Sequence, residues 1–212
     1  MNAMFTDRRD AGKKLAERLA EYREQHAVVV ALPRGGVVLG YEVAKALQAP
    51  LDIVAPRKIG HPLHPEYAIG VVDEKGMRIL NEAEARTVDQ KWLKEETEKQ
   101  RKEAARRIVL YRGGKEPVSL AGKVVIIVDD GIATGLTMRL AVRSVTAQGS
   151  EKIIVAVPVA PEESIAALKA EGADEVVVLE PPEAFAGAVG AHYIRFGQVE
   201  DAEVIKLLHT HI

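Results

Sequence analysis

The sequence contains no cysteine at any of its 212 positions. This absence excludes a disulfide scaffold, a cysteine-ligated zinc site and a thiol nucleophile. Aromatic residues make up only 4% of the chain, so the core has to be built from aliphatic side chains. No apolar run approaches the roughly twenty residues that a membrane-spanning helix needs. We therefore expect a soluble, cytoplasmic protein with no membrane partner.

The chain also has little net charge, because 29 Lys and Arg residues are nearly balanced by 31 Asp and Glu residues. A protein without an overall basic field does not attract nucleic acid in general, so we expect no nucleic-acid partner and only local binding of anions. The first residues, MNAMFTDRRDAGKK, become charged before any apolar stretch begins, which is not the pattern of a secretory signal.

Short apolar runs alternate with helical patterns through most of the chain. The runs, which are rich in β-branched residues, cover residues 27–32, 51–55, 123–128, 152–159 and 174–180. Such runs are typical of strands buried on both faces. Their alternation with helices predicts an α/β fold, in which flanking helices cover an open, mostly parallel twisted sheet. Because neither a repeat nor a linker interrupts the pattern, we expect a single domain over 1–212 with its core at about 27–180.

Two segments do not follow this alternation of strands and helices. Residues 81–112 are strongly helical and highly charged, and their middle, KEETEKQRKE, has no apolar face. We expect this insertion to project from the core, to cover something, or to pack on a second subunit. Residues 181–212 break the alternation as well, and they are expected to form a small subdomain over one edge of the sheet together with the N-terminal helix.

The pattern that carries chemistry is KVVIIVDDGIATGLTM, residues 123–138. Its apolar strand ends in Asp129 and Asp130, at the edge where open parallel sheets bind ligands. Ionised carboxylates only accept hydrogen bonds, so two adjacent ones can hold two vicinal hydroxyls. The loop that follows can direct backbone N–H groups at one anion, and the next helix adds its dipole. The loop residues are Gly131, Ile132, Ala133, Thr134, Gly135, Leu136 and Thr137.

This combination predicts a ribose 5-phosphate site. An Asp pair at a strand end can also simply cap a helix, but the complete ten-residue pattern at 126–135 favours function. The segment IIVDDGIATG resembles the ribose-phosphate signature of the type I phosphoribosyltransferase family, whose substrate is phosphoribosyl pyrophosphate (PRPP). The resemblance implies that Asp129 and Asp130 bind the 2′ and 3′ hydroxyls and that the loop cradles the 5-phosphate.

Two further segments are similar to parts of this family. Pro33-Arg34-Gly35-Gly36 resembles its pyrophosphate loop, in which backbone N–H groups turn toward the leaving diphosphate. Arg57 and Lys58 follow the next strand, where the family often carries a basic residue that meets the diphosphate. Arg34, Arg57 and Lys58 are thus the candidate catalytic cations. Taken alone, an ordinary turn and a solvated basic pair would explain these residues equally well.

The resemblance implies an enzyme that transfers the 5-phosphoribosyl group from PRPP to a nitrogenous base and releases diphosphate. It also implies Mg²⁺, held mainly by substrate oxygens and water, because this ion dehydrates reluctantly. We therefore expect no dedicated protein metal site. The family closes a mobile loop over its substrate, for which the segment from Gly60 into the charged helix is the candidate. A hood covers the sheet edge and selects the base; here it matches 181–196, which does not identify the base.

One alternative function stays open, and several others are disfavoured. A PRPP-binding regulator would keep the fold without catalysis, although Arg34 and the basic pair favour an enzyme. PRPP synthetase needs two tandem domains and an ATP site, for which 212 residues are too few. A receiver domain carries its acidic pair after the first strand, whereas Asp129 and Asp130 lie in the middle of this chain. The glycine motifs of dinucleotide and P-loop enzymes are absent. Members of the family commonly form dimers, so a homodimer is an expectation that the residues alone do not decide.

Overall fold

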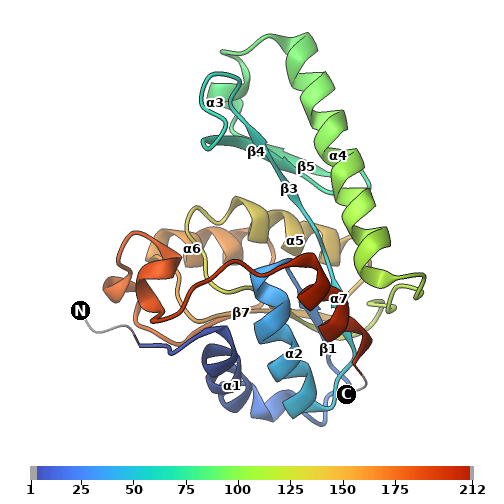
Figure 1. Ribbon diagram of the computed structural model, residues 1–212, viewed down its shortest axis with the longest axis vertical. Coiled ribbons are helices and arrows are strands. Elements are labelled where there is room, and N and C mark those ends of the chain that lie inside the picture. Colours follow the sequence, from blue (N-terminus) through green and yellow to red (C-terminus); the bar gives the residue numbers. More distant parts are fainter. Residues whose placement is uncertain (1–3, 211–212) are drawn as a thin grey trace.

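The structure is a computed structural model that describes residues 4–210 (Figure 1). Five strands form its main sheet, in the order β2-β1-β6-β7-β8, and all neighbours are parallel. They are β1 (Val28–Ala31), β2 (Leu51–Ile53), β6 (Val124–Val128), β7 (Lys152–Val157) and β8 (Glu175–Val178). The prediction of an open parallel sheet is confirmed. Because the chain moves outward from β1 to β2 and returns to the other side of β1 at β6, a crevice lies beyond the ends of β1 and β6.

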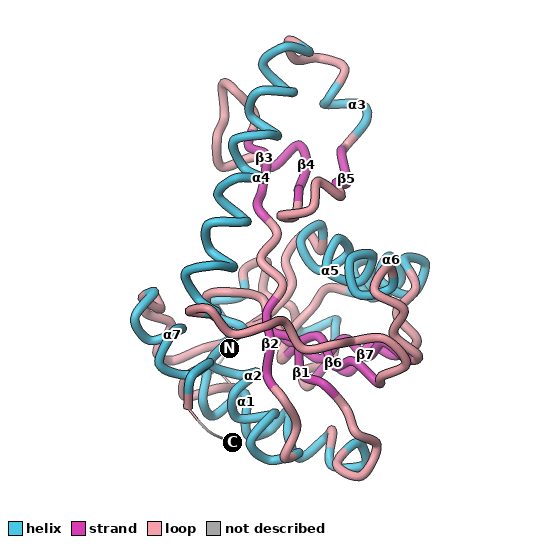
Figure 2. Tube along the Cα trace, turned by 90° about the vertical axis from the view of Figure 1, so that its right-hand side faces the viewer, coloured by secondary structure: helices cyan, strands magenta, loops and turns pink. Residues whose placement is uncertain are grey.

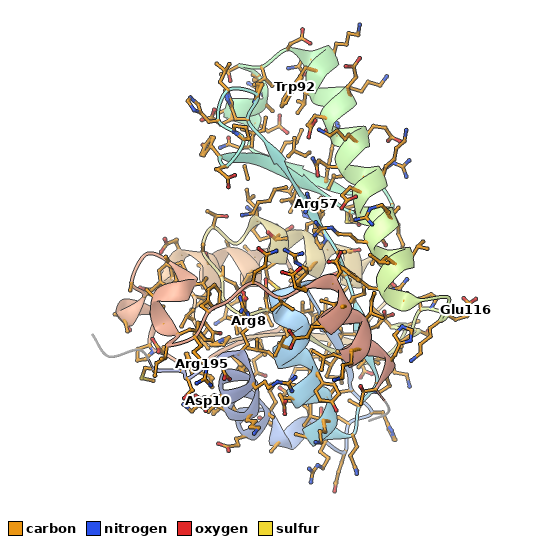
Figure 3. All side chains as sticks on the ribbon, in the orientation of Figure 1. Arg8, Asp10, Arg57, Trp92, Glu116 and Arg195 are labelled. Atoms are coloured by element: carbon orange, nitrogen blue, oxygen red, sulfur yellow. The ribbon has the colours of Figure 1, made fainter. Side chains whose placement is uncertain are left out.

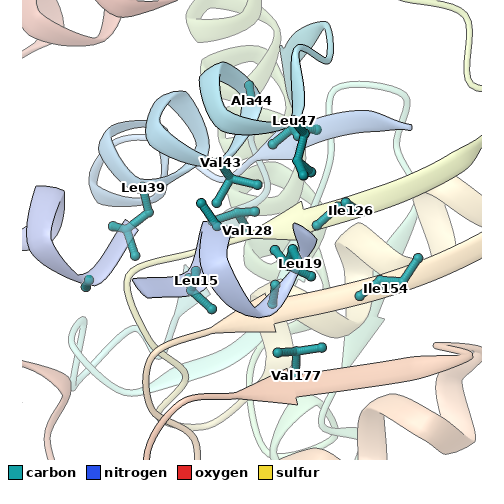
Figure 4. Packing of buried hydrophobic residues seen from close by; sticks show 14 of the residues in the cluster. Leu15, Leu19, Leu39, Val43, Ala44, Leu47, Ile126, Val128, Ile154 and Val177 are labelled. Atoms are coloured by element: carbon teal, nitrogen blue, oxygen red, sulfur yellow. The ribbon is translucent and has the colours of Figure 1, made fainter. Parts of the chain in front are cut away.

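Helices cover both faces of this sheet. The helices α1 (Arg8–Arg18) and α2 (Gly35–Leu47) lie on one face, and α5 (Leu136–Thr146) and α6 (Glu162–Glu171) lie on the other (Figures 1 and 2). Side chains of β6 alternate between the faces: Ile126 and Val128 pack with α1 and α2, as Figure 4 shows, while Ile127 packs with α5. Burial on both faces explains why these strands are continuous apolar runs.

Residues 57–112 form an arm that rises from the main sheet (Figure 1). Its antiparallel sheet contains β3 (Arg57–Gly60), β4 (Ala68–Val72) and β5 (Arg78–Leu80), and its helices are α3 (Glu82–Ala85) and α4 (Gln90–Arg112). The arm has a small apolar core of its own. That core is formed by Ile59, Ile69, Val72, Ala85, Val88 and Leu93. Arg57 and Lys58, which were predicted to follow a strand, lie after β2 and are the first two residues of β3.

The helical pattern from Asn81 to Tyr111 is divided into two helices. The side chain of Asn81 accepts a hydrogen bond at the start of α3, and Asp89 accepts one from the Trp92 N–H at 2.7 Å at the start of α4. Each of these residues caps a new helix, because its side chain satisfies an N–H group that a helix start leaves free. The charged middle of α4 projects from the core, as expected, while both of its ends carry buried apolar side chains.

Residues 181–210 form two separate regions of the structure. A first region contains the short helices η2 (Pro182–Ala184) and η3 (Val189–His192), and it pairs with the N-terminal segment through a bridge between Phe5 and Tyr193. We use the term hood for residues 4–7 and 181–199. The last helix, α7 (Asp201–His209), packs against α2 and α4 at the base of the arm. A further short helix, η1 (Ala20–Tyr22), continues α1.

Candidate functional site

A cavity of about 790 Å³ lies between the C-terminal ends of β1 and β6 and the inner side of the arm. It brings together most of the residues singled out in the sequence. Those that line it are Arg34, Gly35, Arg57, Lys58, Asp129, Asp130, Gly131, Ala133, Thr134, Gly135 and Thr137. Three do not: Gly36 lies beneath Asp129, Ile132 is buried, and Leu136 packs against the arm where it meets α5. Segments separated by a hundred residues thus form one concave surface.

The two adjacent carboxylates each have one oxygen engaged by the protein. Asp129 Oδ1 accepts the N–H of Asp130 at 2.8 Å, and Asp130 Oδ2 accepts from Arg8 Nε at 2.7 Å. Within residues 4–210, neither Asp129 Oδ2 nor Asp130 Oδ1 accepts a hydrogen bond from another residue. One acceptor oxygen of each carboxylate is therefore left for a ligand that donates two hydroxyls.

The electrostatics of the pair are unfavourable without a ligand. Burial raises the pKa of Asp129 well above its ordinary value, and the adjacent charge of Asp130 raises it further. Burial also raises the pKa of Asp130, and Arg8 acts in the opposite direction through its charge and its hydrogen bond. Two like charges at one site favour partial protonation. Hydroxyl donors or a cation bound here would favour the doubly ionised form.

The loop after the carboxylates presents a row of free amides. In the part of the chain that the structure describes, the N–H groups of Ala133, Thr134, Gly135, Leu136 and Thr137 have no protein acceptor. The N–H of Ile132, by contrast, donates to Val159 O at 2.9 Å and anchors the loop. Gly135 precedes α5 with a φ of 75°, a conformation that favours glycine. Free amides at a helix N-terminus form an anion site.

The loop after β1 lies directly against these carboxylates. Its Pro33–Arg34 peptide is cis, and the N–H groups of Arg34, Gly35 and Gly36 have no acceptor among residues 4–210. A Cβ atom on Gly36 would lie 2.8 Å from Val128 O, so only glycine fits. The side chain of Arg34 is 30% exposed, with Nη1 3.5 Å from Asp201 Oδ1. The loop thus offers amides and one accessible guanidinium.

Further cations face the cavity from the arm, where Figure 3 labels Arg57 at the base and Trp92 near the far end. Arg57 Nε donates to Gln100 Oε1 at 3.2 Å, and no carboxylate in residues 4–210 pairs with it. Burial lowers the pKa of Arg57, and the nearby charge of Arg107 lowers it further. A half-buried guanidinium without a counter-ion suits an anionic ligand.

The sequence reasoning did not single out any cavity residue of α4. The structure places Trp92, Glu96, Lys99, Gln100 and Arg107 along the cavity wall. Their spacing of four, three, one and seven residues keeps them on one face of a helix. The sequence therefore contained the spacing that places these residues on one helix face. Charged residues also occupy the other faces, so the spacing alone did not distinguish the face that lines the cavity.

Arg8 was also missed, although it contacts Asp130. It belongs to the pair Arg8-Arg9 at the start of α1, and nothing in the local pattern distinguishes the two. Of the aromatic residues in the hood, Tyr193 donates from its hydroxyl to Asp130 O at 2.6 Å, while Phe185 stacks on His192 at 5.6 Å between ring centroids. Phe5, Tyr193 and the partly buried Phe185 belong to the apolar core that the main sheet shares with α1 and α2, so they do not form a separate core of the hood.

None of the helices within residues 4–210 is long and apolar enough to cross a membrane. Comparison with known proteins identifies relatives over nearly the whole chain. Two Mycobacterium tuberculosis proteins (strains H37Rv and CDC 1551 / Oshkosh), named only provisionally as phosphoribosyl transferases, are 44% identical over 207 residues. The match covers 97% of this chain and 46% of each relative, so this chain spans about half of their length.

The crystal structure of the protein TT1426 from Thermus thermophilus is 45% identical to this chain, with a TM-score of 0.79. That similarity covers 96% of this chain and 97% of that one. The family model described as "Phosphoribosyl transferase domain" matches residues 4–193, which include the arm, the residues that line the cavity and most of the hood. The chain therefore belongs to the phosphoribosyl transferase domain family.

Proposed function

We propose that this protein is a phosphoribosyltransferase that transfers the 5-phosphoribosyl group of PRPP to a nitrogenous base and releases diphosphate in a Mg²⁺-dependent reaction. One observation carries the proposal. Two adjacent carboxylates, each with a free oxygen, lie in the same cavity as four residues with free backbone amides at the start of α5, namely Ala133, Thr134, Gly135 and Thr137. Donors for a phosphate beside acceptors for a diol match the two ends of a ribose 5-phosphate.

This placement of the sugar leaves the cations for the leaving group. With the diol on Asp129 and Asp130, the diphosphate on C1 would extend toward the loop of Arg34 and toward the base of the arm. Breaking the C1–oxygen bond develops positive charge on the ribose ring and negative charge on the diphosphate. Arg34, Arg57 and the amides of Gly35 and Gly36 would stabilise that negative charge.

The residues at the site fit Mg²⁺ bound mainly through substrate. Residues 4–210 hold no cluster of three or more acidic or histidine side chains that could bind a metal alone. The free oxygens of Asp129 and Asp130 line the cavity, and hard oxygen ligands are those that Mg²⁺ prefers. When bound, the ion would neutralise and orient the diphosphate, with these two carboxylates as its protein partners, directly or through water.

The proposal is tested first by ligand-induced thermal stabilisation. PRPP with Mg²⁺ should raise the Tm of the wild type, because a ligand that binds only the folded state stabilises it. The variant Asp129→Asn/Asp130→Asn should lose this increase. Asp10→Asn is a suitable control, since Asp10 lies on α1 and pairs with Lys14 outside the cavity. A wild type without any response to PRPP would contradict the proposal.

Turnover is tested separately. PRPP consumption and diphosphate release should be measured with a panel of purine, pyrimidine and other nitrogenous acceptors. An acceptor that drives diphosphate release supports an enzyme. Tight PRPP binding without turnover on any acceptor would instead favour a PRPP-binding regulatory protein of nucleotide metabolism, for which the diol and phosphate contacts would serve recognition alone.

A further inference from the structure

The guanidinium of Arg8 is fixed by three different groups. Its Nε donates to Asp130 Oδ2 at 2.7 Å, its Nη1 donates to Gly197 O at 2.7 Å, and its Cζ lies 3.8 Å from the centre of the Phe196 ring. The Arg8 side chain is only 12% exposed. A planar guanidinium can satisfy a carboxylate, a carbonyl and an aromatic face at once, whereas a lysine ammonium cannot. Figure 3 labels Arg8 between the hood and the main sheet.

We propose that Arg8 is a positioning residue for ribose binding: it holds the Asp130 carboxylate through one oxygen, leaves the other oxygen to a ribose hydroxyl, and connects this carboxylate to the hood. The inference rests on the proposed function, because it assigns a role at the same ribose site. Arg8 itself does not line the cavity, so it acts through Asp130.

The surroundings of Asp130 leave little room for another arrangement. A Cβ atom on Gly35 would lie 2.7 Å from Asp130 Cγ and 2.9 Å from Arg8 Nε, so the loop after β1 closes one side of the ion pair. On the backbone side, the Tyr193 hydroxyl donates to Asp130 O. The carboxylate is therefore held by α1, by the hood and by the loop after β1, each from a different direction.

Charge balance gives Arg8 a second effect. The charged and titratable groups around this carboxylate are Asp129 from the same loop, Lys58 from β3, and Tyr193 and Glu180 from the hood region. Lys58 is exposed, so Arg8 is the largely buried cation in contact with the acidic pair. Without it, no neighbouring guanidinium would offset the repulsion between the two carboxylates, and the Asp130 side chain would no longer be held in one orientation.

The same contacts connect the ribose site to the hood. The N–H of Phe5 donates to His192 O at 3.1 Å and the N–H of Ile194 donates to Phe5 O at 2.8 Å. These bonds join the two parts of the hood, residues 4–7 and 181–199, into one unit. Arg8 extends from this unit, and Phe196, which it covers, remains 37% exposed. A movement of the hood would therefore be transmitted to the orientation of Asp130.

The test compares Arg8→Gln with Arg9→Gln, its neighbour on the same helix. Arg9 is 48% exposed and pairs with Glu42 and Glu203 on the surface. The measurements are the Kd of Mg²⁺–PRPP, and the Kd values of ribose 5-phosphate and of its 2-deoxy and 3-deoxy analogues. For Arg8→Gln we expect at least about tenfold weaker PRPP binding and a reduced preference for ribose 5-phosphate over the deoxy analogue that lacks the hydroxyl bound by Asp130. Arg9→Gln should behave as the wild type.

A second variant, Arg8→Lys, keeps the charge without the planar fork, and it should show an intermediate sugar preference. If Arg8→Gln does not fold, Arg8→Lys still tests the inference. Wild-type preference among the three sugar phosphates in both Arg8 variants would overturn this inference and leave the proposed function standing. A wild type that binds neither PRPP nor ribose 5-phosphate would overturn the proposed function, and this inference with it.

Discussion

Gly35 and the carboxylate of Asp130 touch across the crevice, although ninety-five positions separate them in the sequence: a Cβ atom on Gly35 would come within 2.7 Å of Asp130 Cγ. The loop that we propose binds the diphosphate and the acid that we propose binds the ribose are therefore packed as one unit. In PRPP, the diphosphate and the ribose hydroxyls are attached to neighbouring carbons, so the proposed function requires binding groups this close together. The contact also explains why the first helical position after Arg34 is a glycine.

The first prediction concerns Gly35→Ala. The added methyl group has to displace the Asp130 carboxylate or the Arg8 guanidinium, because Cβ contacts below 3 Å do not occur in real structures. We expect PRPP affinity to fall at least about tenfold, which corresponds to ~1.4 kcal/mol. Calorimetric titration measures this loss, and the far-UV circular dichroism of the free protein should stay unchanged. Wild-type affinity in a folded variant would show that this contact is not needed.

The second prediction concerns pH and stability. The pKa of Asp129 in the folded state is raised above its unfolded value of about 3.9, so the folded state binds more protons in the range between the two. Stability should therefore fall as the pH rises through that range and stay low above it. Asp129→Asn removes the repulsion, and it should raise the Tm of the free protein at pH 7 by about 2–4 °C for each kcal/mol relieved.

A control with the opposite sign is available. Burial acts to raise the pKa of Asp10, but hydrogen bonds from Thr6 and Lys14 lower it overall. Asp10→Asn should therefore leave the Tm unchanged or slightly lower at pH 7, and the loss should shrink on acidification. A lower Tm for Asp129→Asn at neutral pH would contradict the interpretation of the acidic pair.

The third prediction separates leaving-group stabilisation from sugar binding. Arg34→Ala should depress turnover of PRPP by about 10²–10³-fold, a range typical for the loss of one preorganised electrostatic donor. Ribose 5-phosphate has no diphosphate, so its Kd should change little. Steady-state kinetics and titration measure the two effects. Equal losses in both would assign Arg34 to sugar binding.

The fourth prediction concerns the arm. Arg107 lines the cavity, is 22% exposed, and pairs with Glu103 at 2.9 Å. Arg107→Gln should weaken inhibition by free diphosphate, more strongly at low salt, because partly exposed charges are screened by ions. Lys94→Gln, on the same helix but outside the cavity lining, is the matched control. An unchanged inhibition constant would exclude Arg107 from the diphosphate site.

The fifth prediction concerns the base of the arm. Arg112 binds Asp52 through Nε at 3.0 Å and Nη2 at 3.1 Å, and Asp52 is 8% exposed. Arg112→Met would leave a buried carboxylate without its cation, which typically costs about 3–5 kcal/mol of unfolding free energy. Arg106→Met breaks an exposed pair with Glu103 and should cost less than about 1 kcal/mol. Urea denaturation measures both, and Asp52→Asn should recover part of the first loss.

The parallel sheet was predictable because its strands are buried on both faces. The run at 123–128 is apolar at nearly every position, and it became β6 in the middle of the sheet. The division of 81–111 into α3 and α4 was missed, although Asn81 and Asp89 are both capping residues. The segment is rich in charged helix-forming residues throughout, so its composition predicts helix on both sides of Asp89 and does not mark the break between the two helices. The positions of Arg57 and Lys58 in a strand depend on pairing with β4, which no local pattern contains.

The amino-acid sequence by itself determined the acidic pair, the small-residue loop after it, and the glycines that begin α2, because the proposed site needs particular residue types at adjacent positions. Only the tertiary structure decided which cations approach them. Arg8 meets Asp130 across 122 positions, and Arg57 meets Gln100 across 43. The physical reason is that residues adjacent in the sequence stay adjacent in any fold. Residues far apart in the sequence become charge partners only when the helices pack on the sheet and the arm takes its position beside it.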